Sequence, residues 1–231
     1  MQAISDNRAA LIEKHRPVIA QAIEAVETRV SWSPYKDSPS TRIHGTEKPP
    51  AGKAAFEARL NRRFELDLPG ITAWAGEETS PYNLEPLGIS YPVSDPDVLV
   101  EAARAGMPEW AKANPELRIA LCLEMAERLY DRNFEVAHAI MHVAGQSYTQ
   151  AFSGSGPNAL DRGIEALAYA TIAMRNVVPT ATYHRKFAGD DVALEKFYTL
   201  VPRGVGLVIC CASFPTWNAY PAMFASLSTG N

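Results

Sequence analysis

An apolar run close to the C-terminal end of the sequence limits the fold more than any other feature. Residues 204–211 are almost wholly apolar and rich in valine and isoleucine, which is typical of a parallel strand buried on both faces. Phe214-Pro215 ends this pattern, and residues 217–227 then carry apolar side chains at helical spacing as far as the stop signal at Gly230. A parallel strand and its crossover helix need a second strand, and none follows in the sequence. We therefore expect an α/β fold in which only the first strand and helix of a larger domain are present.

The central part of the sequence, residues 95–174, is expected to be helical. Asp95 and Asn114 are each followed by proline, which is the usual order of an N-cap and the first helical residue. Gly145 follows a stretch with apolar residues at helical spacing and is expected to end that helix. Further on, residues 194–207 have the β-branched and aromatic content of strands. The chain is thus predicted to consist mainly of helices that cover a small part of a sheet.

The N-terminal part of the sequence has a weaker pattern. Residues 7–30 carry an apolar stripe at helical spacing that Pro17 interrupts, so either two short helices or one kinked helix is expected. Residues 31–93 are rich in proline, and only residues 53–62 have a helical pattern. Such a stretch is either a strap packed over the later part of the chain or partly disordered, and its aromatic residues favour the packed strap.

Composition excludes several classes of protein. No run approaches the ~18 apolar residues that a membrane-spanning helix needs, and the polar start does not resemble a signal peptide. The three cysteines include the neighbours Cys210 and Cys211, which cannot readily bridge to each other, and this suggests a reducing compartment. The net charge of −4, with lysine and arginine dispersed along the chain, argues against nucleic acid as the main partner. We therefore expect a cytoplasmic protein with neither a membrane nor a nucleic acid as its partner.

The motifs around the apolar run resemble those of the aldehyde dehydrogenase superfamily. The resemblance covers residues 91–231 and rests on Pro202-Arg203-Gly204-Val205, Phe214-Pro215, Gly230-Asn231 and Ala144-Gly145-Gln146, the last standing where the family usually has a Thr-Gly-Lys turn. Earlier motifs look like the N type of phenylacetic acid degradation proteins, a branch linked to CoA-dependent breakdown of phenylacetate. These motifs are Trp32-Ser33-Pro34-Tyr35, Gly52-Lys53-Ala54-Ala55-Phe56, Phe64-Glu65-Leu66-Asp67 and Pro69-Gly70. Their combination is far more specific than any one of them.

The resemblance implies an aldehyde dehydrogenase-like α/β fold. Residues 1–91 would be a branch-specific helix and proline-rich strap, and residues 92–231 the N-terminal part of the NAD(P)-binding domain. The implied reaction is oxidation, with NAD or NADP, of a CoA-linked aldehyde formed when an activated aromatic ring is opened. The parent enzyme is expected to be a homo-oligomer. In the family a cysteine thiolate attacks the aldehyde and a glutamate activates water, and neither residue can be assigned here, so the chain alone is expected to be inactive.

The resemblance also implies site residues on both sides of the Phe214-Pro215 turn. Ser213 stands where most family members have an asparagine that donates to the oxyanion, and a serine hydroxyl can donate to the same oxygen. Asn218 is a second candidate for that role. The cofactor cleft is expected to be lined by Ile209, Cys210, Cys211 and Ala212, and the substrate tunnel by Phe214, Trp217 and Asn218. Simple packing of a strand, a turn and a helix is the alternative interpretation of these residues.

Other patterns in the sequence allow different functions. Glu135, His138 and His142 share a helical face and could bind a metal, but no facing helix repeats the set, so histidines packed between helices are preferred. One of the two neighbouring cysteines could be a nucleophile, but the family's nucleophile lies further downstream, so buried cysteines at the strand end are expected. The remaining alternative is a non-catalytic chain, either an interaction module built on the helices or a vestigial truncated product.

Overall fold

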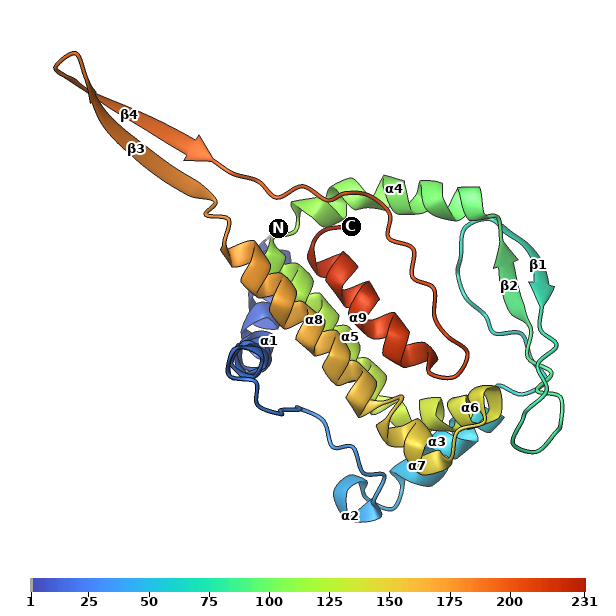
Figure 1. Ribbon diagram of the computed structural model, residues 1–231. Coiled ribbons are helices and arrows are strands. Elements are labelled where there is room, and N and C mark those ends of the chain that lie inside the picture. Colours follow the sequence, from blue (N-terminus) through green and yellow to red (C-terminus); the bar gives the residue numbers. More distant parts are fainter. Residues whose placement is uncertain (1) are drawn as a thin grey trace.

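A bundle of helices forms the core of the molecule (Figure 1). The structure, a computed structural model, describes residues 2–231. The core helices are α1 (Gln2–Thr28), α5 (Pro115–Asp131), α8 (Pro157–Arg175) and α9 (Pro215–Ser228). Their facing sides bury apolar residues from all these helices, among them Ile23, Leu123, Leu167 and Phe224. Burial of these side chains is the main source of stability for a body of this kind, at roughly 25 cal/mol per Å² of apolar surface removed from water.

The start and stop signals in the central part of the sequence act as predicted. Asp95 caps α4 (Pro96–Lys112) by accepting a hydrogen bond from the Asp97 N–H, and the Asn114 side chain accepts from the Leu117 N–H at 2.8 Å to begin α5. Gly145 follows α6 (Asn133–Ala144) with a φ of 70°, the left-handed conformation that glycine adopts without a steric cost. The prediction of a helical region over residues 95–174 is therefore confirmed.

The N-terminal helix and the strap behave differently from each other. Helix α1 continues through Pro17 as one helix, and its apolar side packs on α5 and α8. In the strap the single predicted helix over residues 53–62 is displaced to α3 (Lys48–Glu57), which begins with Pro49-Pro50, because prolines are tolerated in the first turn, where N–H groups lack helical partners. The strap also contains the short helix α2 (Thr41–His44) and an antiparallel pair of strands, β1 (Ile71–Ala75) and β2 (Tyr91–Ser94).

Helix α3 lies against α6, and α7 (Tyr148–Ser153) also packs on α6. The rings of Phe134 and Phe152 are 4.7 Å apart there, and the His44 ring from α2 contacts both at 5.1 and 5.6 Å. The Phe56 side chain is buried and its ring stacks on the ring of His142 at 4.9 Å. These aromatic contacts join the strap to the helical body, as expected for a packed strap.

A long hairpin extends away from the helical body (Figure 1). Strands β3 (Thr180–Phe187) and β4 (Asp190–Phe197) pair antiparallel through a turn at Ala188-Gly189, where both residues have positive φ. Every residue of both strands is exposed. The strand predicted over residues 194–207 is therefore correct only as far as residue 197.

The predicted buried strand over residues 204–211 is wrong. The segment is extended but belongs to no strand, and the side chains of Leu207 and Ile209 are exposed by 85% and 82%. It runs beside α9 (Figure 1). Val205 and Val208 line a hollow that Met107 of α4 also lines. A strand exists only where a neighbouring strand pairs with its N–H and C=O groups, and residues 2–231 offer this segment no such neighbour. The following helix, α9, is where the sequence predicts it.

None of the helices between residues 2 and 231 combines the length and the apolar character that crossing a bilayer would require.

Candidate functional site

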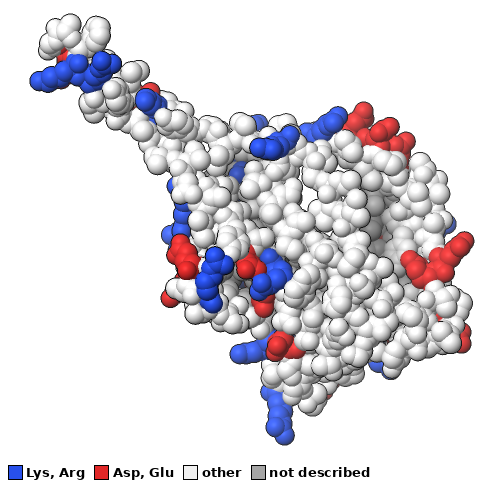
Figure 2. Space-filling model, in the orientation of Figure 1, with Lys and Arg blue, Asp and Glu red and all other residues white. Residues whose placement is uncertain are grey.

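The segment just before α9 carries the residues predicted to line the cofactor cleft. Ile209, Cys210, Cys211 and Ala212 are contiguous and all are exposed. The expectation of buried cysteines at a strand end is therefore wrong, for the reason given above. Neither this segment nor α9 contains a charged residue, and Figure 2 shows a broad uncharged area in the middle of the visible face, where Figure 1 places them. The structure thus presents these residues on an accessible, uncharged surface.

The thiol of Cys211 is hydrogen-bonded to the turn that follows it. Its Sγ accepts a hydrogen bond from the Phe214 N–H at 3.2 Å and lies 3.6 Å from the Ser213 hydroxyl. These hydrogen bonds, that with the Ser213 side chain first, lower the pKa of the Cys211 thiol because they stabilise the thiolate. Cys122 in α5 is the opposite case, since burial raises the pKa of its thiol to about 12. Cys211 is therefore a solvent-accessible thiol whose pKa lies below the ordinary value of a cysteine.

A polar network holds the turn that carries Ser213. The Gln146 side-chain amide donates to the backbone oxygen of Ser213, and the Gln146 amide oxygen accepts from the Ser155 hydroxyl at 3.1 Å. Thr216 in the first turn of α9 donates to the Ser155 backbone oxygen at 2.7 Å. Ser155 is fully buried and Gln146 nearly so. The network holds the backbone of Ser213 and does not use its hydroxyl. The hydroxyl can therefore rotate toward a ligand.

Gln146 and Ser155 are positioning residues that sequence reasoning missed. The sequence does single out Ala144-Gly145-Gln146 as resembling a family turn, but the pattern assigns no partner to the Gln146 side chain. Ser155 belongs to a glycine-rich turn between α7 and α8 and has no motif of its own. Only the tertiary structure places these side chains, which are distant in sequence, under the turn at Ser213.

The three residues predicted for the substrate tunnel lie at the start of α9 but in different surroundings. Phe214 is half-buried, Asn218 is exposed, and Trp217 is exposed by 39%. Of the three, only Trp217 lines a groove whose volume is about 510 Å³. The groove lies between the end of α1, one side of α8 and the first turn of α9. A volume of this size is typical of a site for a small molecule.

The groove also contains groups that the sequence did not single out. Asp161 of α8 accepts a hydrogen bond from the Ser33 hydroxyl at 2.8 Å, which ties the segment after α1 to α8. Burial raises the pKa of the Asp161 carboxyl to about 6. Trp32, from a motif assigned to the N-terminal strap, faces the same groove as Trp217. The groove is therefore built jointly by the N-terminal part of the chain and by the helices that follow it.

The metal site considered on α6 does not assemble in the structure. Glu135 is engaged by two guanidinium groups, those of Arg59 at 3.1 Å and Arg132 at 2.9 Å. The His142 ring shares a hydrogen bond of 2.9 Å with the Ser80 hydroxyl, and the ring of His138 packs near Tyr148. Burial lowers the pKa of both histidines. These residues are therefore packed against the strap and α7 and do not converge on one point.

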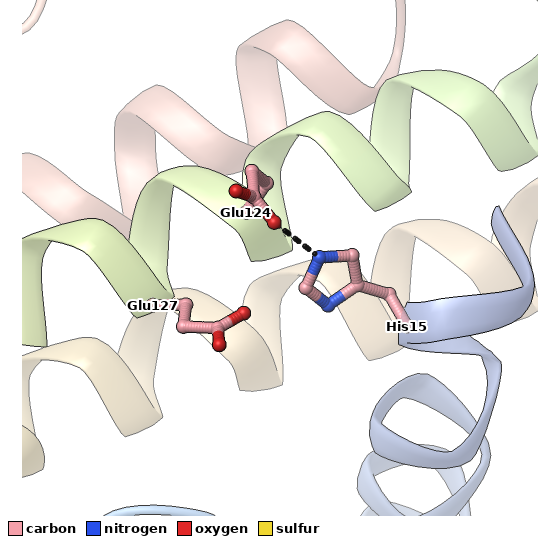
Figure 3. A group of neighbouring side chains, drawn as sticks. All are labelled: His15, Glu124 and Glu127. Atoms are coloured by element: carbon pink, nitrogen blue, oxygen red, sulfur yellow. Dashed lines mark hydrogen bonds and ion pairs between the residues drawn. The ribbon is translucent and has the colours of Figure 1, made fainter. Parts of the chain in front are cut away.

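Another group of potential ligands joins α1 to α5 (Figure 3). His15 Nε2 lies 3.0 Å from Glu124 Oε2, and Glu127 projects toward the same space. The Lys14 ammonium contacts both carboxylates at 2.7 Å and supplies the positive charge that a cation would bring. Hydrogen bonds from Lys14, His15 and Arg128 lower the pKa of the Glu124 carboxyl to about 2. The cluster is an ion-pair network between helices.

Comparison with known proteins identifies the family. Residues 79–231, about two thirds of the chain, match the Aldehyde dehydrogenase family. The chain belongs to this family. The solved NAD-dependent aldehyde dehydrogenase from Burkholderia multivorans is 42% identical, with a TM-score of 0.92 over 96% of this chain and 40% of that one. A 1-pyrroline-5-carboxylate dehydrogenase from Thermus with bound NAD, 21% identical over 87% of this chain and 39% of that one, shows the shared fold with a TM-score of 0.60. A comparison with curated proteins finds no match.

The aldehyde dehydrogenase family explains the mixed architecture. The predicted fold class is confirmed, because 96% of the chain aligns with a solved family member at a TM-score of 0.92. The chain spans about 40% of the length of that solved relative. The activity of a whole aldehyde dehydrogenase is therefore a matter for proposal, as are the branch, the substrate and the roles of the residues before and within α9.

Proposed function

We propose that this chain is the N-terminal part of an NAD(P)-dependent aldehyde dehydrogenase. The observation that carries the proposal is the uncharged, accessible segment 209–214, held at the start of α9 in a chain of this family. Ile209, Cys210, Cys211 and Ala212 would form one wall of the cofactor cleft, and the bound nicotinamide would accept the hydride. We favour NAD over NADP, because solved relatives are described as NAD-dependent or with bound NAD.

Ser213 would act as the oxyanion donor in that enzyme. Its backbone oxygen is fixed by Gln146, and its hydroxyl can leave Cys211, since the contact between them is long at 3.6 Å. An accessible hydroxyl on a fixed backbone suits an oxygen on which negative charge develops. Cys211 would then help to orient Ser213, while the attacking thiolate and the base come from outside this chain. The chain alone would therefore be inactive.

The substrate would be a ring-opened, CoA-linked aldehyde of phenylacetate catabolism. The support is the set of N-terminal motifs, and one of them contributes Trp32 to the groove that Trp217 also lines. Phe214 and Asn218 would contact the aldehyde end of the substrate, closer to Ser213. The free cysteines accord with a cytoplasmic enzyme.

We propose further that the parent enzyme is a homo-oligomer. The hairpin β3–β4 supports this, because it exposes Phe187, Leu194 and Phe197 on strands that contact little of the helical body. The same exposure favours the alternative function, a non-catalytic interaction module. Circular dichroism shows whether the chain is folded, and size-exclusion chromatography shows whether it is monodisperse. A folded, monodisperse chain that binds no NAD supports the interaction module over the enzyme.

The test of the main proposal uses two substitutions at Ser213 in an active enzyme that contains this chain. Ser213→Ala is expected to lower kcat about 10²–10³-fold by removing an oxyanion donor, while Ser213→Asn, the residue usual in the family, retains most of the activity. NADH formation from the ring-opened CoA aldehyde is followed by absorbance, and NAD affinity by calorimetry. Equal kcat values for the wild type and Ser213→Ala would refute the assigned role.

A further inference from the structure

The groove next to Trp217 has one wall that is not part of the helices carrying the proposed site. Arg29 and Trp32 come from the end of α1 and the segment after it, whereas Asp161 belongs to α8 and Trp217 to α9. The hydrogen bond from Ser33 to Asp161 holds this segment in place. Two tryptophans and Arg29 thus line a space of about 510 Å³.

Arg29 differs from the other charged groups of the groove. Arg162 is paired with Glu165, and Asp161 already accepts from Ser33. Arg29 is exposed, and among the side chains that the structure describes no carboxylate lies within 4.0 Å of it. Its guanidinium therefore has N–H donors ready for an anion that enters the groove.

The backbone at Arg29 gives a second reason to single it out. The residue follows the last turn of α1 with a φ of 62°, and the Val30 N–H closes the helix by donating to the Ala25 oxygen at 3.2 Å. Glycine or asparagine adopts this left-handed conformation with less strain, so ending the helix does not explain an arginine. A strained residue beside a candidate site points to a functional use of its side chain.

We propose that Arg29 binds an anionic group at the end of the substrate remote from the aldehyde, with Trp32 and Trp217 contacting the apolar chain between. This inference rests on the proposed function, because it treats the groove as the outer part of the substrate site. The anionic group would be a phosphate of a CoA thioester or a terminal carboxylate. In either case the N-terminal segment determines substrate specificity, and neutral aldehydes of similar length would bind less tightly.

The test measures binding of unreactive probes to the chain by calorimetry at low ionic strength. Coenzyme A is compared with pantetheine, which lacks its phosphates, and 6-hydroxyhexanoate with the neutral hexan-1-ol. The variant Arg29→Gly suits the positive φ and is expected to fold with unchanged or higher Tm. Arg104→Ala, which removes the same charge from the exposed face of α4, is the matched control.

Arg29→Gly is expected to raise the Kd of an anionic probe about tenfold, because a hydrogen bond to a charged group is lost, and to leave the neutral probes unchanged. Arg29→Lys should restore part of the affinity. An effect on coenzyme A alone identifies a phosphate, and an effect on 6-hydroxyhexanoate alone identifies a carboxylate. Equal affinities of the wild type and Arg29→Gly for both anions overturn the inference.

A further variant separates failure of this inference from failure of the proposed function. If Trp217→Ala weakens binding of hexan-1-ol while Arg29→Gly changes nothing, the groove remains the substrate site and only the role of Arg29 is refuted. If neither variant affects any probe, the groove is not the substrate site, and the proposed placement of the substrate is refuted with it.

Discussion

Both the helical body and the segment from β3 to the start of α9 contain large apolar side chains. Of these two regions, only the helical body buries them. Phe224 of α9 is completely buried, whereas Phe197 of β4 is exposed by 74%. A helix satisfies its own backbone hydrogen bonds, and β3 and β4 satisfy each other's, so in both regions burial depends on whether another surface covers the apolar side chains. The comparison teaches that apolar content predicts burial only where the partner surface is present.

The largest contrast is expected in the reactivity of two cysteines. Cys211 on the exposed segment should react with iodoacetamide about 10³-fold or more faster than Cys122 in α5, which is fully buried and must await unfolding. Mass spectrometry of peptides after timed alkylation measures both rates. Ser213→Ala should slow Cys211, because it removes the hydrogen bond that chiefly lowers the pKa of that thiol. Comparable rates for Cys122 and Cys211 would show that the body is not a packed core.

The next contrast concerns two phenylalanines. Phe224→Ala should lower the free energy of unfolding by about 3–5 kcal/mol, because it leaves a cavity between α8 and α9. Phe197→Ala should change it by no more than about 0.5 kcal/mol, since the side chain is exposed on the hairpin. Urea unfolding followed by circular dichroism measures both values. A large loss for Phe197→Ala would mean that the hairpin is covered in solution.

Replacing two helical glycines by alanine should change the free energy of unfolding by smaller amounts and in opposite directions. A Cβ on Gly163 of α8 would lie 2.7 Å from the Phe224 ring, so Gly163→Ala should destabilise by about 1–3 kcal/mol. A Cβ on Gly106 of α4 meets nothing within 4 Å, so Gly106→Ala should stabilise by about 0.5–1 kcal/mol through helix propensity. The same urea experiment applies. A stabilising Gly163→Ala would contradict the close approach of α8 and α9.

The smallest effect on stability is expected when the pH is lowered, through the ion pairs between α1 and α5. The folded pKa of Glu124 is about 2, below its usual value of 4.5, so its contribution to stability is present above about pH 4.5 and is lost as the pH falls toward 2. Glu124→Gln should therefore destabilise the chain at pH 7 and make little difference near pH 2. Glu109→Gln, in an exposed pair on α4, is the control that should show little effect at either pH. A Glu124→Gln effect independent of pH would refute the ion-pair network.

The sequence-based prediction of the candidate site reached only residues that are close together along the chain. The residues around Ser213 were placed together because they are close in sequence, and the structure keeps them at the start of α9. The groove was not foreseen as a whole, since Trp32 and Asp161 lie far from Trp217 in sequence and approach it only through the packing of α1 and α8. Gln146 and Ser155 were missed for the same reason. Tertiary contacts between distant residues leave no periodic signal in a sequence.

The sequence by itself determined the helices, because caps such as Asn114, stops such as Gly145 and apolar spacing act within a few residues of chain. It also carried the motifs of the family. Only the tertiary structure decided that residues 204–211 remain unpaired and that the N-terminal segment shares a groove with α9. The physical reason is the range of the interactions: helix signals are local, whereas strand pairing and groove formation depend on which surfaces meet.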